Sequence, residues 1–183
     1  MTLSETPIKG VYSGHLTAFT DHRGLFAKLF GTSELAAVWQ SRPIRQINLS
    51  ETHTPGTIRG LHFQQHPHTE MKLIVCLDGH VYDVAVDLRA RSETFKQHVG
   101  ILLMPLDFII IPECCAHGFQ VLQPGSRLLY LHSADYAVQS EKGFRFDDKT
   151  LNIVWPLPPV GLSDRDLHQP TLDGTFTGIS PHD

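Results

Sequence analysis

Short runs of apolar residues, separated by turn residues, repeat along the chain and predict an all-β protein. The runs are rich in branched and aromatic side chains, as is typical of strands bounded by turns. Strands this short and this numerous favour a barrel or sandwich over an α/β fold. The predicted strands are Phe26–Phe30, Ile44–Ser50, Thr57–Phe63, Leu73–Leu77, Val81–Leu88, Val99–Leu103, Phe108–Ile111, Gly118–Leu122 and Leu128–His132.

Alternation within the run Val81–Leu88 predicts which side chains share a face of the sheet. Tyr82, Val84, Val86 and Leu88 fall on one face, and Val81, Asp83, Ala85 and Asp87 fall on the other. A carboxylate in mid-strand, at Asp83, therefore faces either solvent or a polar cavity. The dipeptide Asp78–Gly79 before this run predicts a tight hairpin with the preceding run, because Asp-Gly between apolar runs is a strong hairpin signal.

The only helical pattern lies in the segment SELAAVWQ, residues 33–40. Thr32 or Ser33 is its expected N-cap, and Glu34 lies in its first turn. From Leu157 onward the chain is rich in Pro, Asp and Gly and predicts irregular structure. We therefore expect one domain, residues 1–183, with short peripheral helices and an irregular C-terminal tail.

Composition excludes several classes of protein. Hydrophobic residues make up 41% and charged residues 19% of the 183, which excludes intrinsic disorder. The net charge of −4 gives no reason to expect nucleic acid or anionic lipid as a partner. No apolar run reaches the roughly 18 residues of a membrane span, and the polar start of the chain lacks the apolar core of a signal peptide. We expect a cytoplasmic protein without a disulfide framework, since its three cysteines are an odd number and Cys114 adjoins Cys115.

Histidines between Gly60 and Gly79 have the spacing of a known metal-binding motif. His66, His68 and Lys72 stand as in the first cupin motif, G-x5-H-x-H-x3-E-x6-G, with Lys72 in place of the Glu ligand. A protonated lysine has no lone pair with which to coordinate a divalent cation. The chain thus resembles a cupin jelly roll whose metal site has been converted.

The second cupin motif, P-x-G-x2-H, reads Pro112-Glu-Cys-Cys-Ala-His117, with Cys114 in place of the glycine. Metal binding by His66, His68 and His117 remains an alternative. The simplest interpretation is that His66 and His68 are loop histidines between strands.

The segment RGLHFQ, Arg59 to Gln64, indicates a polar cavity. His62 alternates with Leu61 and Phe63 on a predicted strand and therefore points away from their face. Taken alone, it is as well explained by a lone core or surface histidine as by a functional one. Together with Lys72, Asp83 and Arg59, it suggests a polar cavity inside a β-barrel, where pKa values can be tuned.

Three further segments carry residues of possible chemistry. Tyr136 lies before a turn rich in Lys and Arg, and is either a phenolic acid or a rim tyrosine. The LSDRD segment, residues 162–166, is either functional or a solvated turn. In the segment from Phe19 to Phe30, Arg23 either binds an anion or is simply exposed.

Seven segments stand in the order found in one family of enzymes. They are DHRGLF, RGLHFQ, MKLIVCLDGHVYDVAVDLR, IPECCAHGFQVL, DYAVQSEKGFRFDD, LNIVWPL and LSDRD, and they run from about Lys9 to Asp166. The chain resembles the dTDP-4-dehydrorhamnose 3,5-epimerases. This resemblance implies a cupin-type jelly roll, a homodimer, a nucleotide-sugar substrate and no metal or other cofactor.

The resemblance implies inversion of C3, C5 or both in a nucleotide-linked 4-keto-6-deoxyhexose. Because both carbons flank the C4 ketone, their protons are acidified, and epimerisation needs a base, an acid on the opposite face and a cation at the enolate oxygen. By resemblance His62 is the base, Lys72 is the cation and Tyr136 is the acid. Asp166 pairs with His62, and Asp83 lies beside Lys72.

The substrate-binding residues also follow from the resemblance. Arg59 and Arg165 are expected near the phosphates and sugar, where guanidinium groups make paired hydrogen bonds. Arg23 and Phe26 are expected at the nucleotide end. The residues expected to line the cavity are Gln46, Asn48 and His117.

Departures from the family pattern leave alternatives open. Lys28 stands where a Glu near the nucleotide base is usual, Ile47 where Asp is common, and Asp135 where an aromatic residue precedes the tyrosine. The alternatives are an epimerase of one carbon only, an enzyme for a GDP- or CDP-linked sugar, a metal-dependent cupin enzyme, and a non-catalytic binding protein. The intact set of His62, Lys72 and Tyr136 argues against the last, because binding alone needs neither a base nor an acid.

Overall fold

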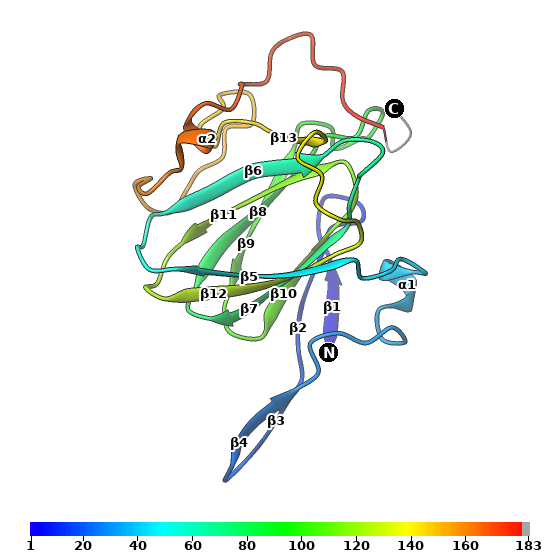
Figure 1. Cartoon of the computed structure of the whole chain (residues 1–183), viewed down its shortest axis with the longest axis vertical. Helices are drawn as coiled ribbons and strands as arrows, with labels where there is room; N and C mark the ends of the chain where they lie inside the picture. Colours follow the sequence, from blue (N-terminus) through cyan, green and yellow to red (C-terminus); the bar gives the residue numbers. More distant parts are fainter. Residues whose placement is uncertain (181–183) are drawn as a thin grey trace.

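Two antiparallel sheets stacked face to face form the body of the protein (Figure 1), in a computed structural model that describes residues 1–180. The six-stranded sheet has the order β1 (Thr2–Glu5), β2 (Tyr12–His15), β10 (Asp107–Ile111), β7 (Lys72–Asp78), β12 (Ser126–His132) and β5 (Gln46–Thr52). The five-stranded sheet has the order β13 (Glu141–Gly143), β6 (Ile58–Gln64), β11 (Cys115–Val121), β8 (Val81–Asp87) and β9 (His98–Leu103). The remaining two strands, β3 (Ala18–Asp21) and β4 (Gly24–Ala27), form a hairpin that projects from the body (Figure 1). The prediction of an all-β fold is confirmed.

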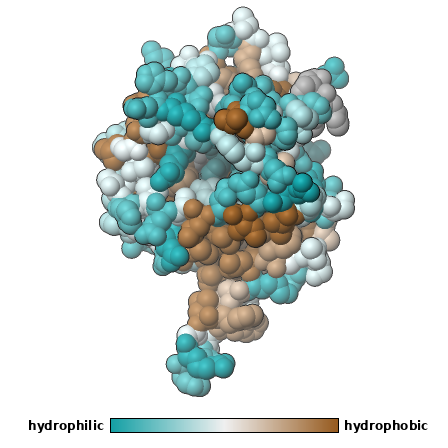
Figure 2. All heavy atoms as spheres, in the orientation of Figure 1, coloured by the Kyte–Doolittle hydropathy of each residue, from teal (hydrophilic) through white to brown (hydrophobic). Residues whose placement is uncertain are grey.

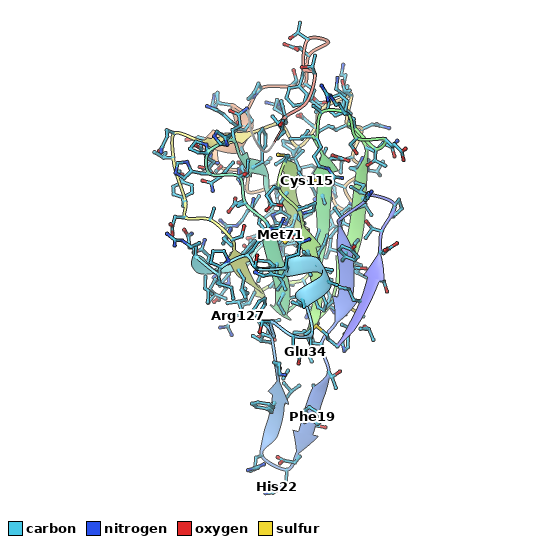
Figure 3. All side chains as sticks on the ribbon, turned by 90° about the vertical axis from the view of Figure 1, so that its right-hand side faces the viewer. Phe19, His22, Glu34, Met71, Cys115 and Arg127 are labelled. Atoms are coloured by element: carbon cyan, nitrogen blue, oxygen red, sulfur yellow. The ribbon has the colours of Figure 1, made fainter. Side chains whose placement is uncertain are left out.

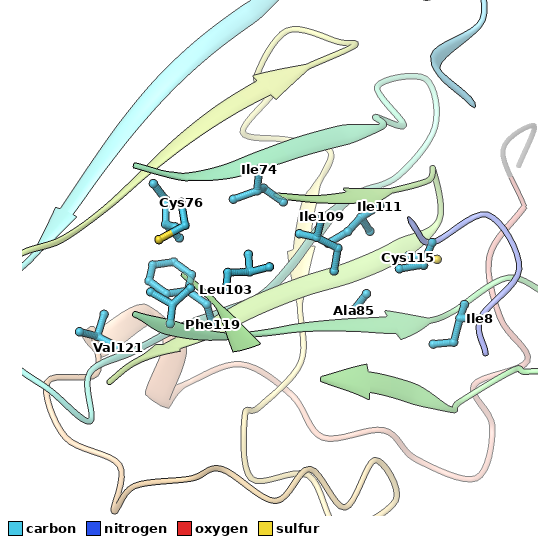
Figure 4. Packing of buried hydrophobic residues seen from close by; sticks show 13 residues of the cluster. Ile8, Ile74, Cys76, Ala85, Leu103, Ile109, Ile111, Cys115, Phe119 and Val121 are labelled. Carbon is cyan, nitrogen blue, oxygen red and sulfur yellow. The ribbon is translucent and has the colours of Figure 1, made fainter. Parts of the chain in front are cut away.

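A hydrophobic core fills the space between the two sheets (Figure 4). Ile74 and Ile109 enter it from the six-stranded sheet, and Ala85 and Phe119 enter it from the five-stranded sheet. The alternation predicted for β8 is confirmed, because Val81 and Ala85 belong to this core whereas Val84 and Val86 pack on the other face.

Both sheets are also covered on their outer faces, which explains why so many strand residues are apolar on both sides. The short helix α1 (Ala36–Trp39) packs Val38 and Trp39 against the outer face of the six-stranded sheet. Residues of the C-terminal part, including Leu151 and Leu172, pack against the outer face of the five-stranded sheet. No helix among residues 1–180 has the length and apolar character needed to cross a membrane.

The prediction that the two strands flanking Asp78–Gly79 pair as a hairpin is wrong. The turn is present, and Gly79 has a φ of +74° that favours glycine. However, β7 pairs with β10 and β12, and β8 pairs with β11 and β9. Both edges of β7 are therefore occupied, and the turn carries the chain from one sheet to the other.

Three local predictions need correction. The predicted strand Phe26–Phe30 ends at Ala27, because residues 18–27 pair with each other in the projecting hairpin. The strands β1, β2, β3 and β13 were not predicted. The helix begins at Ala36 with Leu35 as its N-cap. Ser33 donates to Glu34, which also pairs with Lys28, so these side chains are engaged with one another rather than with the helix. The tail contains an unpredicted short helix, α2 (Asp164–Leu167), whose N-cap Ser163 accepts from the amide of Asp166 at 3.1 Å.

Candidate active site

A cavity of about 790 Å³ opens where strands of both sheets and the α2 segment meet. From the six-stranded sheet it is lined by β5, β12 and the first residue of β7, and from the five-stranded sheet by β6, β11 and the first residue of β13. The residues that line it are Gln46, Ile47, Asn48, Leu49, Ser50, Thr57, Ile58, Arg59, His62, Phe63, Gln64, Glu70, Lys72, His117, Phe119, Tyr130, His132, Tyr136, Glu141, Gly161, Leu162, Ser163, Arg165 and Asp166.

Polar side chains occupy the ends of inward-facing rows that are otherwise apolar. On β7, Ile74 and Cys76 face the inner core, and Lys72 lies two residues before Ile74 on the same face. On β12, Leu128 and Tyr130 face inward, and His132 follows them in the same row. The barrel interior is therefore apolar at one end and polar at the end where the cavity lies.

The imidazole of His62 and the carboxylate of Asp166 form a short ion pair at the cavity wall. His62 Nε2 lies 2.6 Å from Asp166 Oδ1, although the two residues are 104 positions apart in the sequence. Burial alone would raise the pKa of Asp166, but the hydrogen bond and charge of His62 outweigh it and hold that pKa below its usual value. An ionised partner at Nε2 holds a proton there and leaves Nδ1 as the basic nitrogen of His62.

Lys72 is a buried cation in the same cavity, with 7% of its surface exposed. Its ammonium lies 3.1 Å from Glu70 Oε1 and donates to the backbone carbonyl of His62 at 3.4 Å. The second oxygen of Glu70 lies 2.7 Å from Nδ1 of His132. Neither Glu70 nor His132 was predicted as a site residue.

Asp83 is fully buried and hydrogen-bonds His117, which itself lines the cavity. Burial raises the pKa of Asp83, and the nearby charges of His117 and Lys72 oppose this shift only in part. Asp83 is not among the lining residues, so it can act on a ligand only through a neighbour such as His117.

Tyr136 stands at the mouth of the cavity with 53% of its surface exposed. Its hydroxyl donates to Glu141, and this hydrogen bond raises the pKa of the phenol. The other oxygen of Glu141 pairs with the guanidinium of Arg165. The backbone amide of Tyr136 donates to the side chain of Gln46 at 3.0 Å, so β5 helps to hold the tyrosine in place. Glu141 was not predicted as a site residue.

The structure brings most of the predicted binding residues into the cavity but leaves two outside it. Gln46, Asn48, Arg59, His117 and Arg165 all line the cavity, and Arg59 donates to Thr52 at 3.1 Å. Arg23 and Phe26 are on the β3–β4 hairpin, where Arg23 pairs with Asp21 and Phe26 is 72% exposed. Figure 3 shows the side chains of this hairpin, with Phe19 and His22 labelled, well away from the body that holds Met71.

The alternative metal site is not assembled. Among residues 1–180, no three side chains of His, Cys, Asp or Glu are grouped so as to hold a metal ion. His68 hydrogen-bonds Ser140 at 3.0 Å, and neither it nor His66 lines the cavity. Cys114, in the place of the motif's glycine, has a φ of +62°, so this turn keeps the backbone conformation that favours glycine.

Comparison with known proteins gives the chain its family. A family model described as dTDP-4-dehydrorhamnose 3,5-epimerase matches residues 5–174. The chain belongs to the dTDP-4-dehydrorhamnose 3,5-epimerase family. It is 37% identical to the dTDP-4-dehydrorhamnose 3,5-epimerase of Shigella flexneri, over 92% of this chain and 94% of that one. It is also 37% identical to the enzyme of that name from Mycobacterium tuberculosis, over 99% of this chain and 93% of the other.

Solved structures of dTDP-4-dehydrorhamnose 3,5-epimerases and their relatives have the same fold, which confirms the predicted cupin-type jelly roll. A Legionella pneumophila dTDP-6-deoxy-D-glucose-3,5-epimerase in complex with dTDP-4-keto-L-rhamnose superposes with a TM-score of 0.90 at 31% identity, over 98% of each chain. A 3'-monoepimerase from Streptomyces bikiniensis in complex with dTDP-quinovose superposes with a TM-score of 0.84 at 30% identity, over 91% of this chain and 85% of that one. The same fold thus occurs in proteins described as 3,5-epimerases and as a 3'-monoepimerase.

Proposed function

We propose that the protein epimerises a nucleotide-linked 4-keto-6-deoxyhexose, converting dTDP-4-dehydro-6-deoxyglucose to dTDP-4-dehydrorhamnose. The observation that carries this proposal is the His62–Asp166 pair, which faces a cavity that also holds the buried ammonium of Lys72. A base and a cation that line one cavity are what proton abstraction beside a ketone requires. Family membership supports the same reaction class.

In the proposed reaction, a carbon beside the C4 ketone loses its proton to His62 Nδ1, and the electron pair of that C–H bond becomes the enolate. Asp166 stabilises the imidazolium that forms, and Lys72 stabilises the negative oxygen. Tyr136 then donates its phenolic proton to the carbon from the opposite face, which inverts the centre. Because Tyr136 is half exposed, water can restore its proton, and the imidazolium returns its own proton to solvent.

The test of this proposal is proton NMR of candidate 4-keto sugar nucleotides incubated with the protein in deuterium oxide. We expect loss of the C3 signal, the C5 signal or both, with appearance of an epimer. The same spectra distinguish double inversion from inversion at one carbon, the second possibility being raised by the likeness to a 3'-monoepimerase. Comparison of dTDP-, GDP- and CDP-linked sugars tests the nucleotide base. Absence of exchange with every such sugar would refute the proposal.

Replacing Tyr136 with Phe separates proton removal from inversion. The variant keeps the His62–Asp166 pair and Lys72, so the enolate still forms and His62 returns a proton to the face from which it came. We expect deuterium exchange to persist while epimer formation falls by about 10²–10⁴-fold, the usual contribution of a general acid. The measurement compares deuterium uptake with epimer yield. Equal loss of both would show that Tyr136 is needed for enolate formation.

The hairpin supports a homodimer in which two copies complete each other's sites. We propose that Arg23 and Phe26 bind the nucleotide, as the family resemblance implies, yet they lie outside the cavity of their own chain. Apolar side chains on the hairpin and on the edge strand β5 are exposed, and brown residues extend from the hairpin onto the body in Figure 2. Phe19, Leu25, Phe26, Ile47 and Leu49 are all at least half exposed, and a second copy would cover them.

Mixing two inactive variants tests this arrangement. A hairpin variant with Arg23→Ala and Phe26→Ala keeps His62, and a His62→Asn variant keeps the hairpin. We expect each to lose activity alone and activity to return when the two are co-expressed, because a hybrid dimer contains one complete site. Purified hybrid dimers without any gain over the separate variants would contradict the exchange of hairpins.

A further inference from the structure

The pairing of β7 with β12 places two basic residues side by side in the cavity. Lys72 is directly opposite His132 in this antiparallel register, and directly opposite residues share a face of the sheet. Glu70 precedes Lys72 by two residues and reaches the same pair, contacting Lys72 with one oxygen and His132 with the other. A single carboxylate therefore bridges the cation of the proposed mechanism and its cross-strand neighbour.

The three side chains of this bridge are buried, and hydrogen bonds fix the backbone beside them. The side chains of Glu70 and Lys72 are each 9% exposed, and that of His132 is 11% exposed. The backbone amide of Met71 donates to the Ser133 hydroxyl at 2.8 Å, and the amide of Ser133 donates to the carbonyl of Met71 at 3.0 Å. These bonds tie the residue between Glu70 and Lys72 to the residue that follows His132.

The carboxylate of Glu70 is held in its charged form. Burial would raise its pKa, but the charge of Lys72 and the hydrogen bond from His132 outweigh burial and lower the pKa. Other elements bring titratable residues near Lys72: His62 on β6 accepts from it through its backbone carbonyl, and His132 on β12 lies opposite it. The charge of Lys72 acts on Asp83 of β8, which hydrogen-bonds His117 of β11. Of the two nearby carboxylates, Glu70 is the one that contacts the ammonium directly.

We infer that Glu70 is a positioning residue for the proposed epimerisation, holding the Lys72 ammonium at the cavity wall with His132 as its anchor. This inference rests on the proposed function. Glu70 and the carbonyl of His62 engage two of the three N–H donors of Lys72, which leaves one for the ketone oxygen. A long lysine side chain is otherwise flexible, so fixing it lowers the entropic cost of meeting the enolate.

The test is the substitution Glu70→Gln, which keeps the size of the side chain and removes its charge. We expect kcat to fall about tenfold to hundredfold, as for loss of one hydrogen bond to a charged group. KM should change little, because the phosphates are bound elsewhere. The matched control is Asp107→Asn, which removes a carboxylate from the exposed His15–Asp107 pair at 2.7 Å and should leave kcat unchanged.

A second variant and a substrate-free measurement keep this inference separate from the proposed function. His132→Gln leaves Glu70 in contact with Lys72 but removes its anchor, so we expect a smaller fall of kcat in the same direction. In ¹⁵N NMR of the free protein, the Lys72 ammonium signal, assigned by its absence in Lys72→Met, should move or broaden in Glu70→Gln. Unchanged kcat and an unchanged ammonium signal in Glu70→Gln would overturn the positioning role. If the unmodified protein exchanges no sugar hydrogen, the proposed function fails, and the ammonium signal still tests the Glu70 contact.

Discussion

Replacing His62 with Asn is expected to abolish exchange of both the C3 and the C5 hydrogens with deuterium oxide. Asparagine can still hydrogen-bond Asp166, but it cannot accept a proton, so no enolate forms at either carbon. A general base contributes about 10²–10⁴-fold, and the loss here is at least of that order because both centres depend on one base. The measurement is the rate of deuterium incorporation followed by NMR, with epimer formation recorded in the same samples.

The matched control for this variant is His15→Asn. His15 also lies against an aspartate, Asp107, but on an exposed part of the six-stranded sheet. We expect the His15 variant to exchange deuterium at the unmodified rate. If His62→Asn also incorporates deuterium at that rate, the assignment of the base is wrong. Asp83, the next candidate that the sequence offers, would then have to act from full burial behind His117.

The second large effect is expected for Lys72→Met. The enolate then lacks its cation, so exchange and inversion should both fall, by about 10²–10³-fold as for loss of an oxyanion-stabilising donor. This pattern differs from that of Tyr136→Phe, in which exchange survives. The measurement again compares deuterium uptake with epimer yield, at a temperature well below the unfolding transition of the variant.

Stability has to be measured alongside, because this substitution removes the ammonium that pairs with Glu70 and leaves His132 as its hydrogen-bond partner. Breaking a buried ion pair costs about 3–5 kcal/mol, so we expect a lower midpoint of thermal unfolding. Lys149→Met, at an exposed lysine, controls for the change of residue type and should preserve both activity and stability. A folded Lys72→Met variant that retains unmodified exchange rates would remove Lys72 from the mechanism.

Within the candidate site, the sequence could predict which way a side chain faces but not which side chain it meets. Period-two alternation predicted that His62 points away from Leu61 and Phe63. In the structure His62 lines the cavity, and Leu61 and Phe63 belong to the cluster on the outer face of the five-stranded sheet. The partner of His62 lies on α2, 104 residues later, and only the resemblance to a family pointed to it. Alternation could not place Glu70, because it lies before β7 and before the predicted strand Leu73–Leu77. Nor could it identify His132, because its position opposite Lys72 depends on a strand register that a single sequence does not reveal.

The positions of most strands could be predicted from the sequence, but the way the strands pair could not. The runs that became β5 to β12 are apolar enough to be recognised, since most of them are buried on two faces. The short strands β1, β2 and β13 are largely polar and carry no such pattern. The turn at Asp78–Gly79 has the local chemistry of a hairpin, yet competition from β10 and β12 for the edges of β7 decides where the chain goes.

The proposed base and the proposed cation belong to different sheets, so their separation depends on how the hydrophobic core packs between the sheets. His62 is on β6 of the five-stranded sheet and Lys72 is on β7 of the six-stranded sheet, with a hydrogen bond of 3.4 Å between them. The distance between the sheets is set by the side chains packed between them, among them Ile74 beside Lys72. The core therefore serves as a spacer that sets the distance between the proposed base and the proposed cation, so a change in the volume of a core residue is expected to alter activity as well as stability.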